Sequence, residues 1–147
     1  MVMLIIFFFT KIDKIKARSA IRIIDGDTLI LNKQKIRLKG IDAPEIKQQC
    51  TSNINNSKTK IRCGEVARQK LIELIGSSKV HCTNEGKDRY NRQAYCYAGN
   101  INLNREMVRE GYAVACPKYD KSFVLDELHA KEAKRGIWSG RFEKPEE

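Results

Sequence analysis

The first part of the chain alternates short apolar runs with turn residues, a pattern typical of β-strands. β-branched residues dominate positions 21–24, a second apolar run covers 29–31, and Asp25-Gly26-Asp27 lies between the two runs. The glycine and the two carboxylates predict a bulge or turn between paired strands. Residues 18–45 as a whole therefore predict a first strand meander.

The end of that meander carries two carboxylates on a restrained backbone. Gly40 permits a kink after an apolar strand, and Pro44 holds Ala43 in an extended conformation. We therefore expect Asp42 and Glu45 at a strand end, on a backbone with little freedom.

The middle of the chain predicts a loop, a helix and a hairpin. Ser, Asn and Lys are frequent in residues 51–60, which predicts an exposed loop. Apolar residues recur at helical spacing over 64–75, and Gly76 supplies a stop. Residues 79–83 and 93–97 then predict the two strands of a hairpin.

The last part of the chain favours helices. Asn102 is a good N-cap for a short helix that ends at Gly111, and residues 122–135 predict a further helix followed by Gly136. We expect Trp138 to anchor the core behind this last helix. Strands first, one helix between strands and helices last predict an α+β fold.

Length and charge add two expectations. The 147 residues fit one domain with a substantial core. The net charge is +10 and the pI is near 9.5, which fits a polyanionic partner because basic side chains replace counterions along a phosphate backbone. A codon bias toward Lys and Ile would produce the same excess, so charge alone does not identify the partner.

The N-terminal residues 2–9 form an apolar run, far shorter than the roughly 20 residues needed to span a bilayer as a helix. The run fits the low end of a secretory signal, although no Lys or Arg precedes it and the small-residue site Ala17-Arg18-Ser19 is mediocre. We expect residues 1–19 to be a signal peptide or N-terminal extension, 20–142 the domain and 143–147 a tail. A misassigned start codon and a buried N-terminal strand are the alternatives.

Five cysteines bear on the cellular compartment. None is spaced as C-x-x-C, which argues against a zinc site. Cys82 and Cys96 flank the predicted hairpin and Cys50 and Cys63 bracket the predicted loop, so we expect these two disulfides, with Cys116 in neither. Disulfides predict a secreted or periplasmic protein, whereas five reduced cysteines would predict a cytoplasmic one.

Three carboxylates and one guanidinium lie close together in the first half of the chain: Asp27, Arg37, Asp42 and Glu45. Carboxylate oxygens suit Ca²⁺ or Mg²⁺, and a planar arginine suits phosphate. The cluster therefore predicts a cation site beside an anion site. Turn aspartates solvated by water are the alternative.

Five motifs follow one another along the chain. They are Asp25-Gly-Asp-Thr28, Arg37-Leu-x-Gly-Ile-Asp-Ala-Pro-Glu45, Asp88-Arg-Tyr-Asn-Arg92 followed by Ala94, Asn102-Leu-Asn104 with Met107, Val108 and Gly111, and Arg135-Gly-Ile-Trp138. Each is weak alone, but in this order they resemble the staphylococcal nuclease (thermonuclease) family over roughly residues 18–140. The resemblance implies a five-stranded OB-fold β-barrel with three α-helices.

The same resemblance implies a Ca²⁺ site. Its ligands would be the carboxylates of Asp27 and Asp42 and the backbone carbonyl of Ala43. Many family members have Thr at the position of Ala43, but a main-chain ligand survives this difference. Asp25 is expected to be structural and not a ligand.

Glu45 corresponds to the family residue that hydrogen-bonds the attacking water. Arg37 and Arg92 correspond to two arginines that bind the phosphate, where forked guanidiniums can stabilise the charge that develops on a phosphodiester attacked by water. His81 and His129 have no partner at a catalytic spacing and are expected to be structural or exposed.

Arg89, Tyr90 and Tyr119 correspond to positions that contact the nucleotide. Phosphate contacts and base stacking carry no sequence readout. The resemblance thus implies a Ca²⁺-dependent endonuclease that hydrolyses single-stranded DNA and RNA with low sequence specificity and leaves 3′-phosphate products. We expect a monomer with no stable protein partner and no membrane anchor; the alternative is a non-catalytic OB-fold domain that binds nucleic acid.

Overall fold

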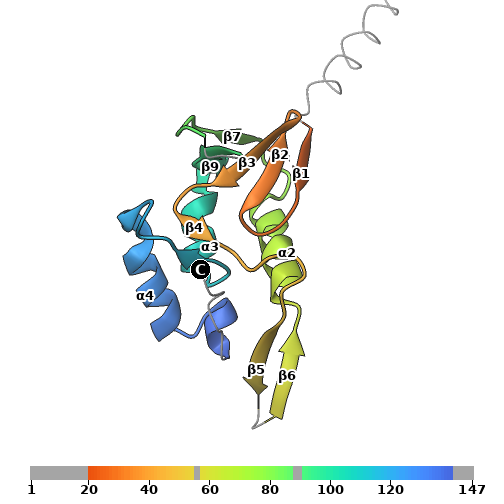
Figure 1. The fold of residues 1–147 in the computed structure, drawn as a ribbon, viewed down its shortest axis with the longest axis vertical. Helices are drawn as coiled ribbons and strands as arrows, with labels where there is room; N and C mark the ends of the chain where they lie inside the picture. Colours follow the sequence, from red (N-terminus) through yellow and green to blue (C-terminus); the bar gives the residue numbers. More distant parts are fainter. Residues whose placement is uncertain (1–19, 55–56, 88–90, 141–147) are drawn as a thin grey trace, which may run out of the picture.

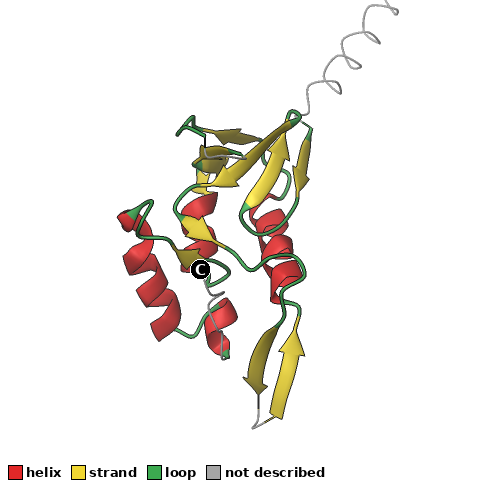
Figure 2. Ribbon diagram, in the orientation of Figure 1, coloured by secondary structure: helices red, strands yellow, loops and turns green. Residues whose placement is uncertain are grey.

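The computed structural model describes residues 20–54, 57–87 and 91–140. Within these ranges the fold is α+β, with three α-helices and four hydrogen-bonded sheets (Figure 1, Figure 2). This confirms the predicted fold class and the number of helices. The described strands form separate sheets and do not close into one five-stranded barrel.

The largest sheet is an antiparallel meander extended by one parallel strand. Its strands, in spatial order, are β1 (Ile21–Ile23), β2 (Thr28–Leu31), β3 (Gln34–Leu38) and β8 (Arg92–Ala94). The first three strands confirm the predicted meander, and β8 runs parallel to β3. Alternate residues of the sheet are buried in the core: Ile23, Leu29, Ile36, Leu38 and Ala94. The residues between them lie on the outer face of the sheet.

The remaining strands form smaller sheets. They are β7 (Val80–Cys82), β9 (Cys96–Ala98) and β10 (Ile101–Asn102) in one sheet, and β4 (Ile41–Asp42) with β11 (Val114–Ala115) in another. β7 and β9 are antiparallel with Cys82 opposite Cys96, which confirms the predicted hairpin.

A β-bulge interrupts this hairpin. Lys87 lies opposite Arg92, one residue out of register with the pairing of Cys82 and Cys96. Tyr95 donates its backbone N–H to the hydroxyl of Thr83 at 3.0 Å. The predicted strand at 93–97 is therefore divided into β8, which pairs with β3, and β9.

Residues 51–54 and 57–60 lie in two paired strands, so the predicted loop is wrong. β5 (Cys50–Ile54) and β6 (Ser57–Ile61) pair antiparallel and project from the lower end of the molecule in Figure 1. The threonines and isoleucines of this segment are β-branched and suit strands. Its polar composition alone did not distinguish an outlying hairpin from a loop.

Both predicted disulfides are present. Cys50 and Cys63 join the start of this hairpin to the first residue of α2 (Cys63–Ile75), and Cys82 and Cys96 join β7 to β9. Cys116 takes part in neither bridge. The sequence therefore predicted correctly which cysteine lies outside the two disulfides.

Two helices confirm the predictions. α2 ends at Gly76, whose φ of +53° lies in the left-handed region that favours glycine. α3 (Leu103–Arg109) begins at Asn102, whose side chain accepts a hydrogen bond from the backbone N–H of Arg105 at 3.0 Å.

The third helix, α4 (Val124–Glu132), is shorter than the predicted 122–135. A 3₁₀ turn, η1 (Lys121–Phe123), precedes it. Ala130 is fully buried, whereas Leu125 and Leu128 are 67% and 46% exposed. The helix thus packs through a small residue and leaves two of its large apolar residues on the surface.

The main chain of the motif at 135–138 packs directly against the main chain at Gly111. Gly111 and Gly136 have φ values of +83° and +53°, and Ile137 donates its N–H to the carbonyl of Gly111 at 2.8 Å. A Cβ at either glycine would collide with main-chain atoms of the other segment. Trp138 then lies half-buried in η2 (Gly136–Ser139), with Lys131 Nζ 4.7 Å from its ring centroid and outside the buried core cluster. The prediction that it anchors the core is wrong.

One buried amide joins the main elements. The side chain of Asn104 is fully buried and makes three hydrogen bonds to the main chain. Its oxygen accepts from Cys96 N at 3.0 Å, and its nitrogen donates to the carbonyls of Lys39 and Ala94 at 2.9 and 3.1 Å. Asn104 therefore ties α3 to β8, to β9 and to the segment after β3.

We predict that Asn104→Ala lowers the free energy of unfolding by about 2–4 kcal/mol, because it leaves buried main-chain groups unpaired and opens a cavity. Urea denaturation of the purified protein measures the change. The control is Asn84→Ala, an exposed asparagine that should stay within about 0.5 kcal/mol of wild type. Equal stabilities of the two variants would contradict the prediction.

Candidate active site

Asp27 is a carboxylate buried at the end of the turn between β1 and β2. It is 3% exposed. One oxygen, Oδ2, accepts the N–H of Ala43 at 2.9 Å, and Oδ1 accepts the hydroxyl of Thr28 at 2.8 Å. Gly26 makes the close approach possible, since a Cβ there would collide with the side chains of Ala43 and Ala67. The turn is therefore held against both the segment after β4 and α2.

Arg37, the last residue but one of β3, bridges two aspartates. Its Nη1 lies 3.3 Å from Oδ1 of Asp27, and its Nη2 lies 3.3 Å from Oδ1 of Asp42. Asp42 ends β4 and is more exposed than Asp27. The structure thus brings together Asp27, Arg37, Asp42 and the main chain of Ala43, four of the residues that the sequence placed in one site.

The electrostatics of this cluster follow from its burial. Desolvation raises the pKa of Asp27 from 3.8 to about 7; the charge of Arg37 opposes this shift and the nearby charge of Asp25 adds to it. For Arg37, burial acts to lower the pKa, but Asp27 and Asp42 raise it by more. The guanidinium of Arg37 therefore does not offset the whole cost of burying the charge of Asp27.

Asp25 supports the turn and does not contact the guanidinium of Arg37. Its Oδ1 accepts the backbone N–H of Asp27 at 3.1 Å. This bond agrees with the structural role expected for Asp25.

Glu45 lies in the segment that links β4 to β5, and its side chain is exposed. The main chain around it is tied down on both sides. Glu45 N donates to Oε1 of Gln48 at 3.3 Å, and Gln48 N donates back to the carbonyl of Glu45 at 2.8 Å. Gly64 packs so closely on the Glu45 carbonyl that no Cβ would fit. A solvent-facing carboxylate is thus presented on a fixed backbone.

The structure does not bring Arg92 to Arg37. In the parallel pairing of β3 with β8, Arg92 lies beside Ile36 and Gln93 lies beside Arg37. Neighbouring residues in a strand project to opposite faces, so the two arginines do so as well. Nη1 of Arg92 bonds Oε1 of Gln34 at 2.8 Å, and Nη2 bonds the carbonyl of Thr83 at 2.7 Å. The catalytic role of Arg92 stays a prediction.

Of the three residues predicted to contact the nucleotide, Tyr119 lies in the described part of the chain. Tyr119 is 62% exposed, and Lys118 Nζ lies 5.8 Å from its ring centroid. Arg89 and Tyr90 lie outside the described residues.

Sequence reasoning missed one cluster near the end of β3. The hydroxyl of Tyr95 donates to Oδ2 of Asp120 at 2.5 Å, and Lys39 Nζ lies 5.9 Å from the Tyr95 ring centroid. Burial and the bond to Asp120 raise the pKa of Tyr95. These contacts join residues distant in sequence, so no spacing could have shown them.

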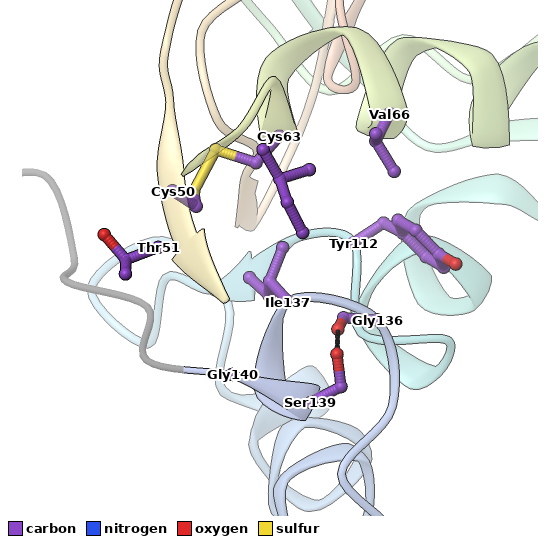
Figure 3. Close-up of a pocket in the computed structure, with 10 residues that line it drawn as sticks. Cys50, Thr51, Cys63, Val66, Tyr112, Gly136, Ile137, Ser139 and Gly140 are labelled. Carbon is purple, nitrogen blue, oxygen red and sulfur yellow. Dashed lines mark hydrogen bonds between the residues drawn. A yellow bond between two sulfur atoms is a disulfide. The ribbon is translucent and has the colours of Figure 1, made fainter. Parts of the chain in front are cut away.

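Other candidate sites are less informative. A mainly apolar cavity of about 110 Å³ lies beside the Cys50–Cys63 disulfide, and no predicted site residue lines it. Figure 3 shows the side chains around it. His81 and His129 are exposed, and His81 stacks on Tyr97, as expected for histidines outside the site.

Two kinds of feature are absent from the described part of the chain. Within 20–54, 57–87 and 91–140, no group of three or more His, Cys, Asp and Glu side chains is placed to hold a metal ion. No helix in those ranges is long and apolar enough to cross a membrane.

Comparison with known proteins places the chain in one family. The sequence model of the family described as "Staphylococcal nuclease homologue" matches residues 35–140. The chain is 34% identical over 137 residues to "Micrococcal nuclease" of Shigella flexneri, which covers 81% of the chain and 71% of that protein. It is 34% identical over 128 residues to an "Uncharacterized endonuclease" of Escherichia coli O157:H7, covering 81% and 74%.

A plant relative is similar over the same region. "Probable staphylococcal-like nuclease CAN3" of Oryza sativa subsp. japonica is 33% identical over 123 residues, which cover 81% of the chain but only 29% of that protein. The chain therefore spans less than a third of the length of this relative. The matched region contains Asp42, Glu45 and Arg37 together with the Gly111 and Gly136 contact. The chain belongs to the staphylococcal nuclease family.

Proposed function

We propose that the protein is a Ca²⁺-dependent nuclease that hydrolyses single-stranded DNA and RNA with low sequence specificity and leaves 3′-phosphate products. The observation that carries the proposal is the convergence of Asp27 and Asp42 on the guanidinium of Arg37. The bacterial relatives named micrococcal nuclease and endonuclease support the nuclease part of this proposal.

The residues at this point fit a hard divalent cation. Asp27 and Asp42 supply carboxylate oxygens that both lie 3.3 Å from the guanidinium of Arg37. The pKa of the buried Asp27 stays raised despite that guanidinium, so a cation bound there would stabilise its ionised form. We assign these two carboxylates and the carbonyl of Ala43 as ligands. Ca²⁺ accepts such an irregular oxygen set more readily than Mg²⁺ does, and when bound it would polarise the phosphate.

The other residues act on the water and on the phosphate. Glu45 accepts a hydrogen bond from the attacking water and receives its proton; its exposed carboxylate on a fixed main chain suits this role. Arg37 stabilises the charge that develops on the phosphoryl oxygens. The water oxygen bonds to phosphorus as its proton passes to Glu45, the P–O5′ bond breaks, and the departing 5′ oxygen takes a proton from solvent. Arg92 is proposed as the second phosphate ligand, which requires its side chain to leave Gln34 and Thr83.

Substrate contacts complete the proposal. Arg89 and Tyr90 bind the nucleotide end, and the exposed ring of Tyr119 stacks on a base. The net charge of +10 suits a polyanionic substrate.

The proposed domain is 20–142, with 1–19 as a signal peptide or N-terminal extension and 143–147 as a tail. The family match at 35–140 lies within that domain. The two disulfides support a secreted or periplasmic location. The proposed protein is a monomer.

Purified protein should degrade heat-denatured DNA in Ca²⁺ and stop when a chelator is added, because the proposed oxygen ligands hold a hard cation at the phosphate. Gel analysis of product length over time measures the rate. Full turnover in Mg²⁺ with a chelator selective for Ca²⁺ would contradict the choice of metal. DNA binding without cleavage in Ca²⁺ would favour the non-catalytic OB-fold alternative.

The charge on Asp27 gives a pH prediction. Because folding raises its pKa from 3.8 to about 7, the folded protein binds more protons than the unfolded chain between these values. The associated stability is complete at low pH and is lost as the pH rises through about 7. Relative to Asp27→Asn, the wild type without Ca²⁺ should lose about 2 kcal/mol of unfolding free energy between pH 5 and pH 7. Urea unfolding of both proteins tests this, and a pH-independent difference would show that Asp27 titrates normally.

The two arginines are distinguished by matched Lys substitutions. Lys keeps the charge but loses the planar fork, so Arg37→Lys should lower kcat on denatured DNA by about 10²-fold, the scale of losing one preorganised donor. We expect the same loss for Arg92→Lys if Arg92 reaches the phosphate. A melting curve of each sample is the control. Near-wild-type turnover of either variant would remove that arginine from the catalytic residues, and a large fall in melting temperature for Arg92→Lys would show that its bonds to Gln34 and Thr83 are structural.

A further inference from the structure

A row of basic side chains crosses the outer face of the largest sheet, next to the candidate active site. Strand pairing places Arg22 beside Ile30, and Ile30 beside Lys35. Residues that pair directly project to the same face. Arg22 and Lys35 therefore flank Ile30 on one side of the sheet.

Arg37 lies on this same face. It pairs with Thr28 of β2, two residues along from Ile30, and is two residues from Lys35 in β3. Two residues of a strand span about 6.6 Å, and two strand spacings span about 10 Å. The row of Arg22, Ile30 and Lys35 is thus one step away from the arginine proposed to hold the scissile phosphate.

Contacts within the described part of the chain do not explain why positions 22 and 35 carry basic side chains. Arg22 and Lys35 are exposed, and neither forms an ion pair with a residue of the described ranges. Ile30 between them is half-buried, so the floor of the row is apolar and its two sides are positive. On the opposite side of Arg37, Lys39 lies over the ring of Tyr95 and close to Asp120, whose pKa it helps to lower. The two sides of Arg37 therefore differ, and only the side of Arg22 and Lys35 offers cations without a neighbouring carboxylate partner.

We propose that Arg22 and Lys35 bind a phosphate of the same single strand, next to the phosphate at Arg37, with Ile30 beneath it. The proposal rests on the proposed nuclease function and extends it: the substrate is an oligonucleotide that runs across the outer face of β1, β2 and β3. Two long side chains about 10 Å apart can converge on one phosphate between them. The spacing along β3 is similar to that between successive phosphates of an extended strand.

The test compares two double variants with equal loss of charge. Arg22→Gln with Lys35→Gln removes the proposed contacts, and Lys60→Gln with Lys79→Gln removes two exposed lysines from other parts of the surface. Glutamine keeps most of each aliphatic stem, so melting temperatures should stay near wild type. Binding of a fluorescent single-stranded 12-mer is measured by anisotropy, with a chelator present and at several salt concentrations.

We expect the first variant to weaken binding about 5- to 10-fold and to reduce the slope of log K against log salt by about 0.7, the value for one phosphate contact on a single strand. The control should change binding less than 2-fold. Equal effects of the two variants would overturn the proposal and leave only a general effect of net charge.

Cleavage supplies an independent measurement. With Ca²⁺, the first variant should lose kcat/KM on the 12-mer by about the same factor with kcat unchanged, and should match wild type on a dinucleotide, which is too short to reach Arg22 and Lys35. An equal loss on both substrates would overturn the proposal. If no protein cleaves any substrate, the nuclease function fails, while the anisotropy result still decides whether this face binds a single strand.

Discussion

The burial of one carboxylate constrains the whole active-site region. Asp27 is almost inaccessible to water, and its charged form is therefore costly. The fold offsets this cost with the N–H of Ala43, the hydroxyl of Thr28 and the guanidinium of Arg37. These three groups come from different segments, so satisfying one side chain fixes the β1–β2 turn, β3 and the end of β4 relative to one another.

The same arrangement leaves the site incompletely neutralised. Arg37 is shared between Asp27 and Asp42, and Asp25 adds further negative charge behind Asp27. A fully paired site would have little affinity for a cation or for a phosphate, because each partner would already be satisfied. An arginine held between two carboxylates is positioned but not saturated, which suits the exchange of partners that the proposed function requires when a metal and a substrate bind.

Local signals in the sequence were enough to predict much of this fold. Gly76 and Asn102 mark helix ends through their own backbone and side-chain chemistry, and the order of the motifs brought Asp27, Arg37 and Asp42 to one site. Other features depend on contacts distant in sequence. The direction of Arg92 follows from the pairing of β8 with β3 and from the bulge opposite it, and the three bonds of Asn104 reach segments up to 65 residues away. The hairpin of β5 and β6 could not be predicted for another reason, because a polar hairpin and a polar loop have similar compositions.

The alternation of the largest sheet links stability to the proposed chemistry. Ile36 and Leu38 are buried on one face of β3, and Arg37 lies between them on the other. A slip of one residue in the pairing of β2 and β3 would bury the guanidinium and expose both apolar side chains, so the apolar core itself enforces the register that presents Arg37. The position of the arginine is therefore specified by its hydrophobic neighbours. The register also decides the position of Arg92. Arg92 pairs with the buried Ile36, so its side chain lies on the core side of the sheet and points away from Arg37. There its guanidinium donates hydrogen bonds to Gln34 and Thr83.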